Sequence, residues 1–390
     1  MDVEPVAPDQ RLRIAILGDF DSVHTRAWLD WFIRRGHDLH AVSFYPPRQP
    51  LDGVTPHILR PHAPRAASPA SAATSRPRLP RGLLRLAHAA RYRAAGLPRV
   101  LREMHPDVLH AHFLVEHGFY GSFAGVRPYV VTAWGSDVLV EPERDPVSNL
   151  IARWTVRRAD LLTSNNGYMA GRLVALGAPA PKVHVVTLGA DSSFLARGGD
   201  SVNVRGRVGG TPCVLSTRAH EPLYNIGEIV TAYASVVRAR PDVRLAIAHG
   251  GAQTAALQRQ ARDAAGRVEF LGVLDRAAFR DALADAEVFV SVPSSDGTSV
   301  ALLQAMAAGC FPIVSDLATQ RELVEHGVNG FRVPLHRPDI LADAIARALA
   351  DHGLRRAAAA RNRAIVEERG LNEREMARME ALYRGLLPVS

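Results

Sequence analysis

The sequence predicts an α/β protein made of two Rossmann-like domains, each built on a parallel β-sheet. The chain of 390 residues is too long for one ordinary domain and suits two α/β domains of about 180 residues each. Short apolar runs of strand length alternate with helical periodicity in both halves, as in parallel sheets with crossover helices. Residues 196–211, rich in Gly and Arg and without periodicity, separate the two series and are typical of a domain linker. Two such domains are expected to face each other across a cleft.

The N-terminal series begins with an apolar strand at residues 13–18 and a helix at residues 25–35, which Gly36 ends. A second strand is expected at residues 40–44. Residues 61–80, rich in Ala, Pro, Ser and Arg, are predicted to form a surface loop. The later strands of this half are predicted at residues 108–110, 129–132, 161–164 and 183–186.

Residues 81–104 have the pattern of one helix, with several leucines and many arginines. A basic amphipathic helix can lie on an anionic membrane surface, which would make a peripheral membrane contact through Arg81 to Met104. A solvated arginine face over an ordinary core-facing side is the commoner explanation of such a pattern. The sequence leaves both alternatives open.

The C-terminal series repeats the alternation of strands and helices. Because right-handed crossovers place the carboxyl ends of parallel strands at one edge of the sheet, ligands are expected at that edge. The strands of this half are predicted at residues 213–216, 244–248, 268–271, 288–292 and 311–314.

Composition narrows the class of protein. Basic residues exceed acidic ones by 47 to 39, but Lys182 is the only lysine. This bias toward arginine, without a helix-turn-helix, zinc or aromatic-platform pattern, argues against a nucleic-acid partner. Cys213 and Cys310 each lie in an apolar run and are predicted to be buried, reduced thiols. The N-terminus lacks the order of a signal peptide and no apolar run approaches the ~20 residues that span a bilayer, so a cytoplasmic bacterial protein is expected.

The most informative segment follows the fourth predicted strand of the C-terminal half. A polar turn leads there into a helix that begins near Thr298 or Ser299, either of which can cap it. The backbone N–H groups of Thr298, Ser299 and Val300 are expected at the positive end of the helix dipole, which suits an anion. Gly297 lets a ligand approach the backbone closely, and Gln304 leans back toward the same helix end. The segment therefore predicts an anion site, with a merely well-capped helix as the alternative.

This segment resembles the signature of glycosyltransferase family 4, retaining enzymes of the GT-B type. In that pattern an acidic residue, a Gly-containing turn and a second acidic residue eight positions later hold the donor. Asp296 takes the first place and Gln304 the second. The resemblance implies that Asp296 touches the donor sugar near the scissile bond, that the turn amides of Gly297, Thr298, Ser299 and Val300 touch sugar and phosphate, and that Gln304 binds the ribose hydroxyls. Glu is commoner in both places, so both positions depart from the family.

Arg218 ends the first strand of the C-terminal half, where the family has an arginine on the donor diphosphate. A permanently charged, planar guanidinium suits that task. The lysine that usually follows about five residues later in the family is missing, and Tyr224 or Asn225 is expected to substitute for it through a hydrogen bond. The resemblance also implies that glycines at two further strand ends lie beside the phosphates and the base, with ordinary turn glycines as the alternative. These glycines are Gly250, Gly251 and Gly272.

In the N-terminal half, two strand-end segments resemble the family motifs that line the cleft. One ends in His112, and the other contains Trp134 and Asp137. Many family members carry a histidine where Trp134 stands, in contact with the transferred sugar. The resemblance gives His112 and Asp137 as polar, catalytic groups that meet the acceptor or the sugar, and it places Asp21, His24 and Trp134 on the acceptor side. A lone histidine at a strand end is more often satisfied structure than a ligand contact.

The resemblance extends over nearly the whole chain and implies a GT-B fold. Residues 1–195 are expected to form the acceptor domain, residues 212–370 the nucleotide-sugar domain, and residues 371–390 a helix that crosses back to the N-terminal domain. The predicted reaction transfers a hexose-like sugar from a nucleoside diphosphate of UDP or GDP type to an acceptor hydroxyl, with retention at the anomeric carbon. The acceptor would belong to polysaccharide, glycolipid or secondary-metabolite biosynthesis. No metal motif or His/Cys cluster stands out, so no metal or other cofactor is expected.

Two alternatives remain. One is a catalytically silent relative that acts as a binding or partner subunit, because Gln304, Tyr224 and Trp134 all depart from the family pattern. The other alternative is a dinucleotide oxidoreductase. It is weaker, because Gly18-Asp-Phe-Asp after the first strand lacks the glycine fingerprint that such enzymes need.

Overall fold

The computed structural model describes residues 4–59, 81–195, 211–264 and 267–388. The surface loop predicted at residues 61–80 lies outside the described residues. So do residues 196–210, which make up nearly all of the predicted linker.

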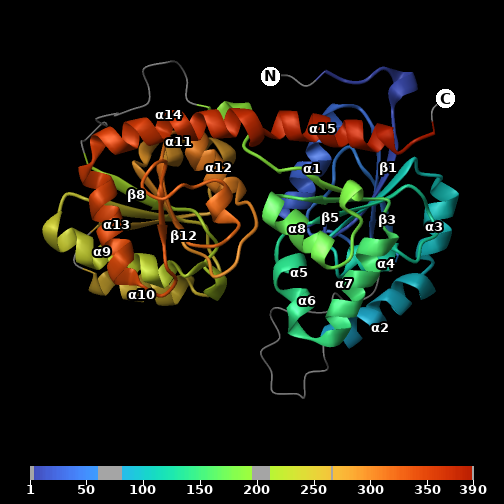
Figure 1. Ribbon diagram of the computed structural model, residues 1–390, viewed down its shortest axis with the longest axis horizontal. Helices are drawn as coiled ribbons and strands as arrows, with labels where there is room; N and C mark the ends of the chain where they lie inside the picture. Colours follow the sequence, from blue (N-terminus) through green and yellow to red (C-terminus); the bar gives the residue numbers. More distant parts are fainter. Residues whose placement is uncertain (1–3, 60–80, 196–210, 265–266, 389–390) are drawn as a thin grey trace. The chain divides into compact units, whose positions relative to one another are not determined.

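The chain divides into two compact units, Met1–Val186 with Met376–Ser390 and Thr187–Glu375. The first unit has a seven-stranded sheet in the order β3-β2-β1-β4-β5-β6-β7, and all its pairs are parallel (Figure 1). Its strands are β1 (Arg13–Leu17), β2 (Asp38–Ser43), β3 (Thr55–Ile58), β4 (Val108–His112), β5 (Tyr129–Ala133), β6 (Leu161–Ser164) and β7 (Val183–Val185). Its helices are α1 (Val23–Arg34), α2 (Arg81–Ala94), α3 (Leu97–Met104), α4 (His117–Gly121), α5 (Ser136–Leu139), α6 (Glu141–Arg144), α7 (Pro146–Arg158) and α8 (Gly167–Ala175).

The strand order of the first unit locates its ligand edge. The central strands β4 and β5 are buried along their whole length, as expected for parallel strands that helices cover on both faces. The chain runs outward from β1 to β3 in one direction and from β4 to β7 in the other, so the order reverses between β1 and β4. Such a switch point opens a crevice at the carboxyl ends of the two strands.

The second unit has a six-stranded parallel sheet in the order β10-β9-β8-β11-β12-β13, and its switch point lies between β8 and β11 (Figure 1). Its strands are β8 (Cys213–Ser216), β9 (Arg244–Ala248), β10 (Arg267–Gly272), β11 (Val288–Ser291), β12 (Phe311–Ser315) and β13 (Phe331–Val333). Its α-helices are α9 (Ile226–Ala239), α10 (Thr254–Asp263), α11 (Arg276–Asp285), α12 (Val300–Ala307), α13 (Pro338–Ala350) and α14 (His352–Arg369).

All the strands that the sequence predicts are present, with small shifts at their ends. Two further strands were not predicted. β3 is a partly exposed edge strand that contains Pro56, so it shows neither an apolar run nor clear alternation. β13 has only three residues, too few for a periodic signal.

The sequence predicts one continuous helix over residues 81–104, and this prediction is wrong about its continuity. The structure has two helices, α2 and α3, because Gly96 adopts a φ of 89° and serves as the N-cap of α3. A left-handed backbone cannot continue an α-helix, and glycine adopts it at little steric cost.

The C-terminal helix α15 (Asn372–Gly385) begins where the sequence predicts. Its last turns belong to the first unit, where Tyr383 is fully buried and its hydroxyl lies 2.5 Å from His110 Nδ1. Glu380 of the same helix pairs with Arg35 at 2.9 Å. The end of α15 is therefore part of the core of the first unit.

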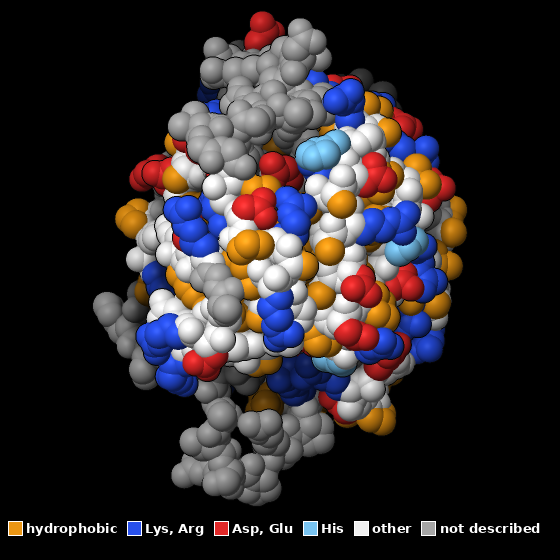
Figure 2. Space-filling view, turned by 90° about the vertical axis from the view of Figure 1, so that its left-hand side faces the viewer, with side chains coloured by type: hydrophobic (Ala, Val, Ile, Leu, Met, Phe, Trp, Pro, Cys, Tyr) orange, Lys and Arg blue, Asp and Glu red, His pale blue; other side chains and the backbone are white. Residues whose placement is uncertain are grey.

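The surface and the cysteines agree with an ordinary globular protein. Basic and acidic side chains are interspersed over the face shown in Figure 2, and several exposed arginines pair with carboxylates, as Arg240 does with Asp242. Cys213 and Cys310 are buried free thiols, as predicted. Within the described ranges, no helix has the length and apolarity that crossing a membrane requires.

Candidate active site

The candidate site of the second unit lies at its switch point, where β8 and β11 are paired neighbours. β8 ends at Ser216 and is followed by Thr217 and Arg218, whereas β11 ends at Ser291 and leads through a turn into α12. Because both strands end at the same edge, side chains far apart in the sequence meet there. This edge collects most of the donor residues that the sequence predicts.

Arg218 is at the centre of this group. Its Nη1 donates to Ser299 Oγ at 2.5 Å, and its Nη2 lies 3.0 Å from Asp296 Oδ2. Its guanidinium carbon lies 4.4 Å from the ring centroid of Tyr224, a cation–π contact. The structure thus brings together Arg218, Asp296, Ser299 and Tyr224, all of which the sequence singles out.

The charges of this group are partly withdrawn from water. Only 13% of the Arg218 side chain and 17% of the Asp296 side chain are exposed. Burial raises the pKa of the Asp296 carboxyl, while the Arg218 guanidinium and the Gly297 N–H act against this rise. A guanidinium has five N–H donors, so the contacts with Ser299 and Asp296 leave donors for a phosphate group. A second anion would compete with Asp296 for the same cation.

Helix α12 adds its N-terminus to this group. Ser299 is the N-cap, and its side chain accepts a hydrogen bond from the N–H of Leu302, so the predicted capping is confirmed. Val300 is the first helical residue, and Gln304 lies one turn further along with a half-buried side chain. The positive end of the helix dipole therefore lies beside Arg218, which favours a negatively charged ligand.

Asn225 has a different task from the one predicted. Its Nδ2 donates to the carbonyl of Val292 and to Ser294 Oγ, both at 2.9 Å, so its amide holds the turn after β11. Its backbone φ of 51° is suited to Asn and ends the short 3-10 helix before α9. The expectation that Asn225 substitutes for a phosphate-binding lysine needs correction, because its donors are engaged. Tyr224 instead supports the Arg218 guanidinium.

The three predicted glycines differ in what they do. A Cβ on Gly251 would lie 2.7 Å from the carbonyl of His220, so this glycine is required for close backbone packing. Gly272 has a φ of 68° and open space around it, and Gly250 is similarly uncrowded. Close backbone packing accounts for Gly251, while the space at Gly250 and Gly272 is compatible with the predicted ligand approach.

Several polar residues at this edge were missed by the sequence analysis. Ser216 Oγ, Thr217 Oγ1 and Gln320 Oε1 are buried and have no hydrogen-bond partner among the described residues. Buried polar atoms are normally satisfied, so these three, which lie at or after the ends of β8 and β12, are suited to hydrogen bonds with a polar ligand. A small polar residue at a strand end carries no distinctive sequence signal, and Gln320 lies in a loop far along the chain.

In the first unit, the switch point lies beside an aromatic and histidine cluster. The rings of His24 and Trp134 stack with centroids 5.1 Å apart, and Trp28 makes edge contacts with His112 and Trp134. His112 Nδ1 lies 3.2 Å from Thr25 Oγ1, and its Nε2 has no hydrogen-bond partner in the described part of the chain. Burial lowers the pKa of His112 to about 3, so the imidazole is neutral at physiological pH.

Asp137, predicted to meet the acceptor or the sugar, is engaged by the backbone of its own unit. It is fully buried, and its carboxylate accepts hydrogen bonds from the N–H groups of Leu114 at 2.7 Å, Trp134 at 3.0 Å and Gly135 at 2.8 Å. These bonds join the loops after β4 and β5. The structural role of Asp137 is therefore to position Trp134 and its neighbours.

Asp21 lies in the loop after β1, where its Oδ1 accepts a hydrogen bond from the N–H of Arg48 at 2.8 Å. Asp19 and Asp21 form an Asp-x-Asp sequence in this loop. Within the described residues, however, no group of three or more His, Cys, Asp or Glu side chains could hold a metal ion.

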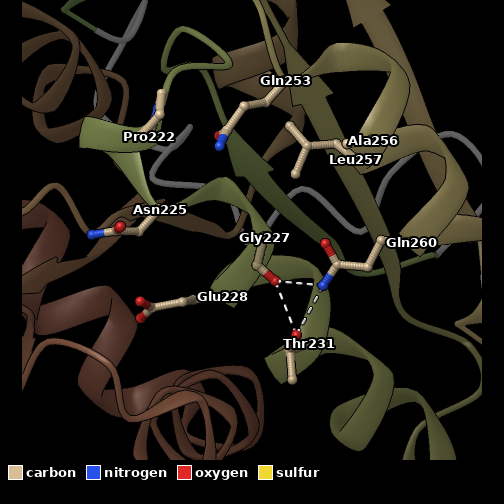
Figure 3. Close-up of a pocket in the computed structure, with 9 residues that line it drawn as sticks. All are labelled: Pro222, Asn225, Gly227, Glu228, Thr231, Gln253, Ala256, Leu257 and Gln260. Atoms are coloured by element: carbon tan, nitrogen blue, oxygen red, sulfur yellow. Dashed lines mark hydrogen bonds between the residues drawn. The ribbon is translucent and has the colours of Figure 1, made fainter. Parts of the chain in front are cut away.

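In the second unit, a groove of about 390 Å³ lies between α9 and α10 (Figure 3). Gln260 Nε2 and Thr231 Oγ1 both donate to the carbonyl of Gly227 on its wall, at 2.9 and 3.0 Å. Of its other polar residues, Glu228 pairs with His336, and Asn225 donates to the turn after β11. The groove is lined by Pro222, Asn225, Gly227, Glu228, Thr231, Gln253, Ala256, Leu257 and Gln260.

Comparison with known proteins agrees with this geometry. Residues 13–166 match the family "Glycosyl transferase 4-like", and residues 212–351 match "Glycosyl transferases group 1". The phosphatidyl-myo-inositol mannosyltransferase of Mycobacterium tuberculosis is 36% identical over 135 residues, which are 34% of this chain and only 35% of that relative. The N-acetyl-alpha-D-glucosaminyl L-malate synthase of Bacillus anthracis is 23% identical over 75% of this chain and 78% of its own length.

Solved structures resemble the whole chain. HepE (Alr3699) of Anabaena, crystallised in complex with UDP, has a TM-score of 0.72 at 16% identity over 96% of this chain and 100% of its own. Sucrose-phosphate synthase of Thermosynechococcus elongatus has a TM-score of 0.72 at 18% identity, over 96% of this chain and 99% of its own. The two parallel-sheet units therefore define a protein of the GT-B glycosyltransferase class. Within that class, the chain belongs to glycosyltransferase family 4.

Proposed function

We propose that this protein is a retaining, metal-independent glycosyltransferase that takes a hexose-like sugar from a nucleoside diphosphate, of UDP or GDP type, to an acceptor hydroxyl. The observation that carries the proposal is the group at the switch point of the second unit. Arg218 contacts Ser299 and Asp296 there, beside the N-terminus of α12. A planar cation and a helix N-terminus together suit a diphosphate.

In this proposal the diphosphate replaces part of the contact between Arg218 and Asp296. The guanidinium and the α12 N-terminus stabilise the negative charge that grows on the diphosphate as the bond between the anomeric carbon and the phosphate oxygen breaks. The departing phosphate oxygen takes the proton of the acceptor hydroxyl, whose oxygen bonds to the anomeric carbon on the same face. Asp296 is then released toward the donor sugar. No metal is needed, because Arg218 and the helix supply the positive charge.

The crevice of the first unit is proposed to hold the acceptor. The stacked rings of His24 and Trp134 offer an aromatic surface for a sugar or another ring. The unpartnered Nε2 of buried His112 is suited to a hydrogen bond with a hydroxyl. The two relatives reported above are named as a phosphatidyl-myo-inositol mannosyltransferase and an N-acetyl-alpha-D-glucosaminyl L-malate synthase, so an alcohol group on a small molecule or lipid is the proposed acceptor.

A peripheral membrane contact through α2 is part of the proposal. Leu83, Leu84 and Leu86 of this helix are about 40% exposed, at 41%, 39% and 43%. Arg81 and Arg85 both pair with the buried carboxylate of Glu141, and Arg85 is itself buried, whereas 40% of the Arg81 side chain stays exposed. Any contact with lipid would therefore depend on the leucines and on the exposed arginines further along the helix.

Calorimetric binding of UDP, GDP, ADP and dTDP tests the donor site. Wild type is expected to bind one or two of them, and Arg218→Ala is expected to weaken this binding by about 10- to 100-fold, since charge-assisted hydrogen bonds are lost. Arg337→Ala is the matched control, because Arg337 also pairs with an aspartate in the second unit, Asp339, but at an exposed place.

The outcomes separate the alternatives. Unchanged binding by a folded Arg218→Ala protein would contradict the assignment of Arg218. Nucleotide binding without transfer or donor hydrolysis would favour a silent binding subunit, for which the departures at Gln304 and Trp134 already argue. Turnover that persists in excess EDTA, with an α-linked donor giving an α-linked product, would support the metal-independent and retaining parts of the proposal.

A further inference from the structure

The turn between β11 and α12 is held from one side by the loop that follows β12. Thr319 Oγ1 donates a hydrogen bond to the carbonyl of Asp296 at 2.9 Å, and Gln320 Nε2 donates to the carbonyl of Gly297 at 3.4 Å. Both side chains are almost fully buried, with 3% and 2% of each residue exposed. A carbonyl only accepts, so the nitrogen of the Gln320 amide must be the atom that faces Gly297.

These two bonds determine where the next N–H groups point. In a trans peptide the C=O and the N–H lie on opposite sides of the chain. Fixing the carbonyl of Asp296 therefore directs the N–H of Gly297 away from Thr319, toward the Asp296 carboxylate beside Arg218, and this N–H acts to lower the pKa of that carboxyl. Fixing the carbonyl of Gly297 directs the N–H of Thr298 away from Gln320 in the same way.

We propose that Thr319 and Gln320 are positioning residues that fix two successive peptide planes, so that the N–H groups of Gly297 and Thr298 face a donor phosphate next to Arg218. Successive N–H groups turned to one side form a concave site for an anion. This inference rests on the proposed function, and it adds residues outside the donor segment that the family resemblance covers.

Such a support is needed because of Gly297. Glycine lets a peptide plane rotate at little steric cost, so the turn has no intrinsic preference for this orientation. The residues just after β11 are held by Asn225, which donates to Val292 and Ser294, and by Ser315, which donates to the carbonyl of Pro293 at 2.8 Å. Those bonds anchor the beginning of the turn, whereas Thr319 and Gln320 act at its phosphate-facing end.

The test compares nucleoside diphosphate with monophosphate. Thr319→Val and Gln320→Met each remove one donor with little change of shape, and calorimetry measures binding of UDP and UMP, or of GDP and GMP if wild type prefers guanosine. We expect binding of the diphosphate to weaken about fivefold for each lost bond. Binding of the monophosphate, which lacks the β-phosphate that carries the transferred sugar in the donor, is expected to stay within twofold. Thr319→Ser keeps the hydroxyl and is expected to bind like wild type.

The chain offers a matched pair of controls. Thr231→Val and Gln260→Met also remove a threonine hydroxyl and a glutamine amide that donate to a glycine carbonyl, that of Gly227, but in the neighbouring groove (Figure 3). These variants are expected to bind both nucleotides as wild type does. Thermal unfolding of every variant shows whether the fold is kept.

Each outcome decides the inference. Equal binding by wild type, Thr319→Val and Gln320→Met overturns the positioning role but leaves the proposed function intact. An equal loss for diphosphate and monophosphate, or a loss in Thr319→Ser as large as in Thr319→Val, also overturns it, since the effect is then general disruption. If Thr319→Val does not fold, Gln320→Met and Thr319→Ser decide the matter. Wild type that binds none of the nucleotides overturns the proposed function and this inference together.

Discussion

At the scale of single residues, the same type of side chain serves different purposes according to burial. Asp296 and Asp137 are both aspartates after a strand of a parallel sheet. Asp296 meets a guanidinium at a switch point and is partly exposed, whereas Asp137 is fully buried and satisfied by three backbone N–H groups. Only the first is placed to exchange its partner for a ligand.

Asp137→Asn is expected to destabilise the first unit by about 1–3 kcal/mol. Asparagine has one oxygen where aspartate has two, so at least one of the buried N–H groups loses its acceptor. Urea unfolding followed by tryptophan fluorescence measures this unit alone, since all four tryptophans, at positions 28, 31, 134 and 154, belong to it. Asp107→Asn is a suitable control, because Asp107 accepts from a single exposed N–H, that of Arg13. Unchanged stability with lost transfer activity would restore the predicted ligand contact of Asp137.

At the scale of elements, helices are placed by the partners of their charged side chains as well as by their apolar faces. α2 is tied to the rest of the first unit by Arg85, whose guanidinium pairs with Glu141 at 2.5 Å and donates to Ser148 Oγ at 2.8 Å. Both ions of this pair are about 6% exposed, so they hold α2 by a buried interaction that only works with both partners present. Part of the basic character of this helix is therefore structural.

Vesicle sedimentation tests what the rest of α2 does. Wild type is expected to bind vesicles that contain phosphatidylglycerol at low salt, and Leu83→Ser/Leu84→Ser/Leu86→Ser is expected to bind several-fold less, because exposed apolar side chains drive insertion at an interface. Binding should also weaken at high salt, as exposed arginines contribute a screened attraction. Val174→Ser, at an exposed valine of α8, is the control. A wild type that stays in the supernatant with all vesicles would show that α2 is an ordinary surface helix.

At the scale of the whole molecule, histidines make the stability of the first unit depend on pH. His112, buried at the end of β4, and the half-buried His117 at the start of α4 both lose contact with water: this lowers the pKa of His112 to about 3 and that of His117 to about 4. In the unfolded chain their pKa is about 6.5. Below that pH the unfolded state takes up protons that the folded state does not, so stability decreases as pH falls, whereas above it neither histidine contributes.

The free energy of unfolding of the first unit is therefore expected to decrease between about pH 6.5 and pH 4, by up to about 1.4 kcal/mol per pH unit for each such histidine. Urea unfolding by tryptophan fluorescence at several pH values measures the slope. His117→Gln should reduce this slope by up to about 1.4 kcal/mol per pH unit, which corresponds to one proton. His105→Asn, at an exposed histidine, should leave the slope unchanged. A slope that His117→Gln leaves unchanged would mean that carboxylates, not this imidazole, carry the acid sensitivity.

Much of the fold and of the donor site could be predicted, because the signals are local. Strands buried on both faces show as apolar runs, and the capping of α12 by Ser299 follows from residue type alone. Arg218 and Asp296 were predicted to belong to one site, yet no pattern in the sequence indicates that their side chains are 3.0 Å apart. Gln320 was missed because its contact with Gly297 joins loops after different strands.

What the sequence by itself determined is therefore the class: periodicity specifies strands and helices, their alternation specifies parallel sheets, and the segment from Asp296 to Gln304 identifies the family. What only the tertiary structure decided is which polar side chains stay available to a ligand. That depends on burial and on hydrogen-bond partners from distant elements. The amides that saturate Asp137, the carbonyl that engages Asn225 and the two donors that orient the turn at Gly297 all come from other parts of the fold, and a local sequence pattern contains no information about them.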